Sequence, residues 1–181
     1  MDPDTARDLA ALRSKHESLQ GQVARLQWLV QWGLLAIVVF VPLARLVEDN
    51  DESDMTSLSL FDAIGFFVSA EPADLGGSSG HPYAVPGGRL VTIIGLFLIL
   101  VGGLATAVTS VMLRDANSTR RAALAQQLSA TVLLLGALAA WVGLAWLPDD
   151  DDLAIRPAWG LLVALGAAVW AYHSAWSFKD R

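Results

Sequence analysis

The 181-residue sequence predicts an all-α integral membrane protein, built as a bundle of four transmembrane helices. Three observations lead to this fold class. Hydrophobic residues make up 54% of the chain and charged residues only 17%, whereas about a quarter of the residues in a soluble domain are charged. Four long apolar runs contain no charged residue, and most of the seven tryptophans stand near the ends of these runs, as is typical of residues at a membrane interface.

The first apolar run is interpreted as a transmembrane helix over residues 28–47. It follows 27 largely hydrophilic residues and is too long for a cleavable signal peptide. The other three spans are predicted at residues 90–113, 124–147 and 158–178, each near the ~20 residues that cross the hydrocarbon. The fourth span is rich in alanine and tryptophan, so neighbouring helices are expected to hold it more than lipid does.

The distribution of lysine and arginine predicts the orientation of the bundle. Nine basic residues fall in the N-terminal segment 1–27, the short connection 114–123 and the tail 179–181, whereas only Arg45, Arg89 and Arg156 fall on the other side. Because basic residues near the spans favour the cytoplasmic side, both termini are predicted to be cytoplasmic. Ten arginines against two lysines suit a high-GC bacterial genome, and we therefore expect a multi-pass protein of the bacterial plasma membrane.

The segment 1–27 is predicted to be a cytoplasmic helix that is amphipathic or forms a coiled coil. Apolar residues and one histidine recur at alternating steps of three and four residues, which is the pattern of a heptad seam. The seam consists of Leu9, Leu12, His16, Leu19, Val23 and Leu26. It favours packing against a helix of a sister subunit or partner; the alternative is a helix lying on the inner leaflet. His16 is interpreted as setting the register, with pH sensing as the alternative.

Residues 48–89 form a long outer loop in which a short amphipathic helix is predicted near residues 57–69, with Thr56 or Ser57 as its N-cap. Its apolar face, expected to lie in the outer interface or over the top of the bundle, comprises Leu60, Phe61, Ile64, Phe67 and Val68. The acidic residues of 48–54, and of the second outer loop 148–157, are interpreted as a solvated surface; loose attraction of Ca²⁺ or Mg²⁺ is the alternative.

Small residues on the spans are expected to let the helices approach closely, because association in lipid depends on such contacts. The expected packing positions are Gly102, Gly103, Thr106, Gly136, Ala140, Gly160, Ala164 and Ala168. His173 is the only intramembrane ionisable residue, and with Tyr172 and Ser174 it is interpreted as an interfacial cluster; a gating or binding role is the alternative.

No catalytic, cofactor or metal site is predicted. The chain has no cysteine, and it lacks the common catalytic motifs. Its three histidines are expected to be split across the membrane, with His16 and His173 inside and His81 outside. A net charge of −6 disfavours nucleic-acid binding. We therefore expect a non-enzymatic accessory, assembly or scaffolding subunit whose partners are the bilayer and other membrane subunits or itself. A membrane enzyme that uses the outer aspartates is a further possibility, although no spacing of residues favours it.

The main alternative is a small homo-oligomeric channel or transporter whose acidic outer loops attract cations. Its expected polar lining is Gln31, Thr106, Thr109, Ser110, Gln126, Gln127, Ser129 and Thr131.

Overall fold

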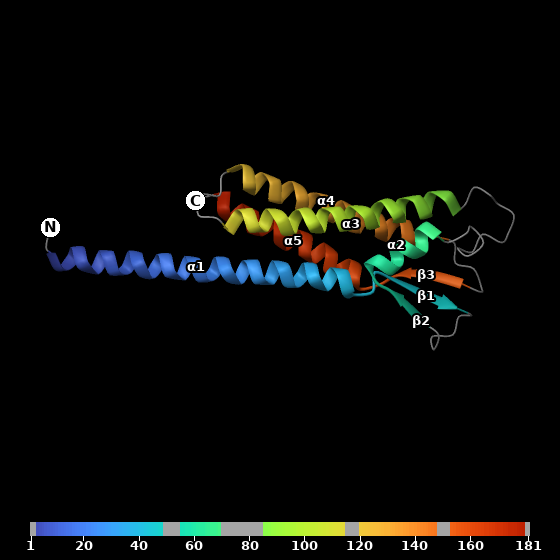
Figure 1. Ribbon diagram of the computed structural model, residues 1–181, viewed down its shortest axis with the longest axis horizontal. Helices are drawn as coiled ribbons and strands as arrows, with labels where there is room; N and C mark the ends of the chain where they lie inside the picture. The colour runs from blue at the N-terminus through green and yellow to red at the C-terminus, as the bar shows by residue number, and fades with distance from the viewer. Residues whose placement is uncertain (1–2, 49–54, 70–84, 115–119, 148–152, 180–181) are drawn as a thin grey trace.

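A computed structural model of the chain is mostly helical and has a small β-sheet at one end (Figure 1). It describes residues 3–48, 55–69, 85–114, 120–147 and 153–179. The long helices run along one another, and the short helix, labelled α2, lies near the sheet (Figure 1). The acidic residues expected at 49–54 and 149–152 of the outer loops lie outside the described residues.

Helix α1 (Pro3–Phe40) is a single helix of 38 residues, about 57 Å long at ~1.5 Å per residue. Pro3 suits a first helical position, where its missing N–H is not needed. The backbone N–H of Val41 still donates to the Ile37 carbonyl at 2.9 Å, and Pro42, which has no N–H, ends the helix. The first span predicted at 28–47 is therefore wrong at its end, because helix stops seven residues earlier, at residue 40.

The all-α prediction is confirmed only in part, because the described residues are mostly helical but include three strands, which form an antiparallel sheet of order β2-β1-β3. Strand β1 (Ala44–Glu48) pairs with β2 (Met55–Leu58) and with β3 (Leu153–Pro157). Backbone hydrogen bonds extend the pairing toward the bundle: the Leu43 N–H donates to the Leu58 carbonyl at 2.8 Å, and the Ala158 N–H to the Leu43 carbonyl at 3.0 Å. The sheet therefore joins the end of α1 to the start of the last helix.

Helix α2 (Leu60–Ser69) is the short helix expected near residues 57–69. Its N-cap is Ser59, not Thr56 or Ser57, which lie in β2. The Ser59 Oγ accepts a hydrogen bond from the Asp62 backbone N–H at 3.5 Å, as an N-cap hydroxyl does, and donates to an Asp62 carboxylate oxygen at 2.6 Å. At the other end, the Arg89 guanidinium donates to the carbonyls of Phe67 at 2.9 Å and Val68 at 3.2 Å.

The remaining helices are α3 (Val85–Arg114), α4 (Arg120–Ala145) and α5 (Gly160–Lys179). Helices α1, α3 and α4 are long and apolar enough to cross a membrane. The apolar part of α5, Gly160–Trp176, is shorter than these three and does not reach that length, so the predicted count of four spans is not confirmed. The chain direction alternates along the bundle, so that α1 begins and α5 ends toward the end where α3 meets α4 (Figure 1).

Candidate functional site

The N-terminal half of α1 projects from the rest of the described structure. It extends well past the ends of α3, α4 and α5 and runs alone there (Figure 1). Leu12 is 64% exposed and Leu19 52% exposed, and the later seam residues Val23 and Leu26 are exposed as well. The side chain of Leu9 lies outside the described part.

This projecting helix lacks the packing that usually stabilises a helix. Isolated helices are marginal in water below about 12–15 residues, and most helical stability in proteins comes from packing of an apolar face. A span of about 20 residues that ends at Phe40 begins near Gly21, so Leu12 and Leu19 are the described seam leucines that lie outside it. These two exposed side chains form the described part of the seam that precedes this 20-residue stretch.

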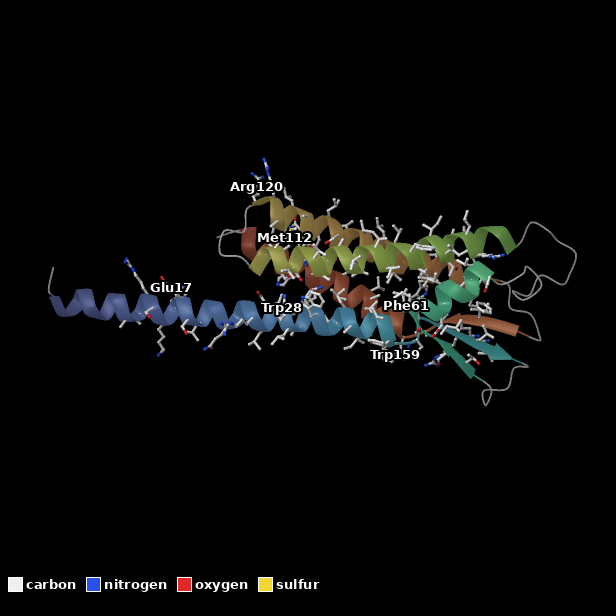
Figure 2. All side chains as sticks on the ribbon, in the orientation of Figure 1. Glu17, Trp28, Phe61, Met112, Arg120 and Trp159 are labelled. Atoms are coloured by element: carbon white, nitrogen blue, oxygen red, sulfur yellow. The ribbon has the colours of Figure 1, made fainter. Side chains whose placement is uncertain are left out.

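The expected apolar face of α2 is divided by the structure between core and surface. Leu60 and Phe67 are almost fully buried and Ile64 packs against the core, whereas Phe61 and Val68 are more than half exposed. Figure 2 shows Phe61 on α2 near the bundle end of the sheet. Because Leu60 and Phe67 anchor α2 to the bundle, the five residues do not form one free contact surface; only Phe61 and Val68 face outward.

Helices α3 and α4 pack in one antiparallel register with alternating steps of three and four residues. A glycine on one helix faces a larger residue on the other in four successive pairs, and two polar pairs follow. The pairs are Thr92–Gly143, Gly95–Ala140, Ile99–Gly136, Gly102–Leu133, Thr106–Ser129 and Thr109–Gln126. A Cβ added to Gly102 would lie 2.6 Å from the Leu133 backbone nitrogen, and one added to Gly136 would lie 2.6 Å from that of Ile99. The glycines therefore set the helix separation.

Of the expected packing positions, Gly103 is the one that the structure does not place in a close contact. A Cβ there would meet only the Leu35 Cδ2, at 3.8 Å, which is an ordinary contact distance. The neighbouring Gly102 faces α4, and one residue of helix rotates the side-chain direction by about 100°. Gly160 packs against the Pro42 carbonyl, to which its N–H donates at 3.1 Å. Ala164 and Ala168 are buried in the core.

Most of the expected pore-lining residues of α3 and α4 instead bond to one another or to the backbone of their own helices. Thr106 donates to the Ser129 hydroxyl at 3.2 Å, and the Thr109 hydroxyl hydrogen-bonds to the Gln126 Oε1. Ser110 donates to the Ala107 carbonyl at 2.7 Å, and the exposed Thr131 to the Gln127 carbonyl at 2.8 Å. Such bonds satisfy polar side chains inside a helical bundle, so most of this set has a role in packing.

Within the described residues, two buried glutamines have amide atoms without a hydrogen-bond partner. Gln31 is 2% exposed, and neither its Nε2 nor its Oε1 is bonded. Gln126 is fully buried, and its Nε2 is unbonded. Leu35, one turn after Gln31, faces Gly103, which places Gln31 near the level of Ala107 on α3. An unsatisfied buried amide is destabilising. The amide groups of Gln31 and Gln126 are therefore candidates for a hydrogen bond to a bound molecule or to a partner helix.

Two grooves mark the sides of the bundle. An apolar groove of about 330 Å³ between α1, α2 and α3 includes Trp32, Phe61 and Gly103 in its walls. A second groove, of about 380 Å³ between α4 and α5, is lined in part by Thr131, Tyr172 and His173. His173 and Trp176 lie one turn apart on α5 and line this groove together. No group of three or more metal-ligating side chains occurs within the described ranges.

Sequence reasoning missed Gly95 and Arg89 as structural residues. Gly95 lies seven residues before Gly102 on the face of α3 that contacts α4, so a seven-residue step back from Gly102 would have identified it. Arg89 caps a helix that ends 20 residues earlier in the chain, and no local pattern indicates that contact.

No family model matches the chain, and neither a curated protein nor a solved structure matches it.

Proposed function

We propose that the chain is a four-span protein of the bacterial plasma membrane that acts as a non-enzymatic accessory, assembly or scaffolding subunit. The observation that carries this proposal is the projecting half of α1, whose exposed leucines have no partner within the described part of the chain. Helices α1, α3, α4 and α5 are the four spans. A helix about 57 Å long that is anchored in a bilayer presents its free end as a docking arm.

The proposed partner is a helix of another membrane subunit, bound along Leu12 and Leu19. The alternative of a homo-oligomeric channel is less well supported, because Thr106, Thr109, Gln126 and Ser129 bond to one another between α3 and α4. A channel would need such groups to face a shared axis. The exposed Thr131 and the groove beside it are the features that still favour the channel.

Replacing Leu12 with Asp tests the docking arm. We expect the variant to lose the partner during mild detergent extraction, with association weaker by about two orders of magnitude, because one buried leucine contributes ~1.5–3 kcal/mol and a carboxylate in the seam adds a desolvation cost. Native mass spectrometry of the extracted complex measures the loss. Ser14→Asp is the matched control, since it adds the same charge on the opposite face of the helix. Equal masses for the wild type and Leu12→Asp would contradict the proposal, as would a symmetric self-complex that conducts ions in liposomes.

Single cysteines test the orientation, because the chain has none of its own. Ser57→Cys lies in the exposed part of β2 and Ser18→Cys in the exposed part of α1. With cytoplasmic termini, a membrane-impermeant maleimide applied to intact cells labels residue 57 and leaves residue 18 unlabelled until the membrane is opened. Labelling of residue 18 in intact cells would reverse the proposed orientation.

A further inference from the structure

Two arginines face each other directly across the sheet. Arg45 on β1 and Arg156 on β3 are paired in the antiparallel register, and residues paired in this way project from the same face. Arg156 is exposed and Arg45 half-buried. Like charges directly opposite each other destabilise a sheet. Among the described side chains, neither guanidinium has an ion-pair partner. Two positive charges are therefore held close together on one face of the sheet, where they attract an anion.

A third hydrogen-bond donor, on β2, lies in the same row of residues across the sheet as the two arginines. Ser57 on β2 is the other cross-strand partner of Arg45 and is exposed, so a hydroxyl and two guanidinium groups stand side by side across all three strands. The residues next to the two arginines along their strands point to the opposite face of the sheet and are buried in the core. They are Ala44 and Leu46 on β1 and Ile155 on β3. Adjacent hydrogen-bond donors of this kind match the oxygens of a phosphate, which arginine binds in a bidentate manner.

Exposed aromatic side chains stand on the bundle side of the same row. Phe40, at the end of α1, is 81% exposed, and Trp159, just before α5, is 49% exposed. Figure 2 shows Trp159 at the junction between the helices and the sheet. Arg156 is three residues from Trp159, or about 10 Å at ~3.3 Å per residue. The headgroup layer extends about 5–8 Å beyond the hydrocarbon, and a long arginine side chain covers the difference.

We propose that Ser57, Arg45 and Arg156 bind the phosphate of an anionic phospholipid in the leaflet next to the sheet. This inference rests on the proposed membrane insertion of the bundle. The aromatic residues select a lipid over a soluble phosphate, because Trp159 and Phe40 provide an apolar surface for the acyl chains below the bound phosphate. The net negative charge of the headgroup offsets the repulsion between the two guanidinium groups.

The full chain in nanodiscs of phosphatidylcholine, with or without phosphatidylglycerol, tests the proposal. We expect phosphatidylglycerol to raise the unfolding midpoint of the wild type. The double variant Arg45→Gln/Arg156→Gln should lose this rise and retain phosphatidylglycerol about tenfold less in native mass spectrometry. In phosphatidylcholine alone, the double variant should be at least as stable as the wild type, because the like-charge pair has been removed. Arg156→Gln alone should show an intermediate loss.

The matched control is Arg120→Gln/Arg121→Gln, which removes two exposed arginines at the other end of the bundle and should keep the rise. An equal loss in both double variants would show general charge attraction and overturn the site. A rise produced in phosphatidylcholine nanodiscs by inorganic phosphate would overturn the lipid. Destabilisation of the Arg45→Gln/Arg156→Gln variant in phosphatidylcholine alone would mean that carboxylates of the chain itself occupy the arginines, which also overturns the proposal. Failure of nanodisc insertion would instead contradict the membrane proposal.

Discussion

Gly102→Ala is expected to lower the unfolding free energy by about 1–3 kcal/mol, whereas Gly103→Ala is expected to raise it by about 0.5–1 kcal/mol. The two residues are adjacent in the same helix but differ in what a Cβ would meet. At residue 102 it would lie 2.6 Å from the Leu133 nitrogen and 2.8 Å from the Leu133 Cα, both of which belong to the backbone. A backbone atom moves only if α4 moves with it.

At residue 103 the added methyl group has ordinary contact distance to Leu35, so the better helix propensity of alanine determines the sign. Unfolding in mixed micelles, followed by tryptophan fluorescence, measures both variants. Each variant is the control for the other, since both replace one glycine of α3 with alanine and differ only in the direction in which the added methyl group points. Two variants of equal stability would mean that α3 and α4 do not pack in the described register.

The helices long enough to span a membrane could be predicted because each depends on a local run of apolar residues. The sheet could not, because its strands have only four or five residues and β1 pairs with β3 more than 100 residues away in the chain. Because residues 44–47 follow directly on the first apolar run and are themselves mostly apolar, their sequence predicts a continuation of the helix. Pro42 is the residue that indicates otherwise, since it cannot continue α1 and lies two residues before β1 begins.

The candidate contact residues were predicted less well for a different reason. A small residue on a membrane helix indicates that close packing is possible, but the direction of the contact depends on the rotation of the helix against its neighbour. Gly102 and Gly103 carried the same weight in the sequence, and only the register against Leu133 separates them. The face of α2 likewise shows the right periodicity, but the sequence does not indicate that Leu60 and Phe67 are covered while Phe61 is not.

Gln31→Leu is expected to stabilise the protein by about 1–3 kcal/mol, the cost of an unsatisfied buried polar group. Gln31 is almost fully buried and neither amide atom has a partner. Leucine has a similar size and no group that needs a hydrogen bond. Gln126→Leu is the matched comparison: its Oε1 bonds to Thr109, so that substitution also removes a hydrogen bond and should be close to neutral. The same micelle unfolding experiment measures both.

The result also bears on why the chain keeps a glutamine in α1. If Gln31→Leu raises stability and leaves partner retention unchanged, the amide is a tolerated polar residue in the bundle. If it raises stability and abolishes partner retention, the amide is kept for a hydrogen bond that forms only in the complex, since function commonly preserves residues that destabilise the isolated protein. A loss of stability in Gln31→Leu would contradict the prediction, because it would mean that the amide already has a stabilising hydrogen bond.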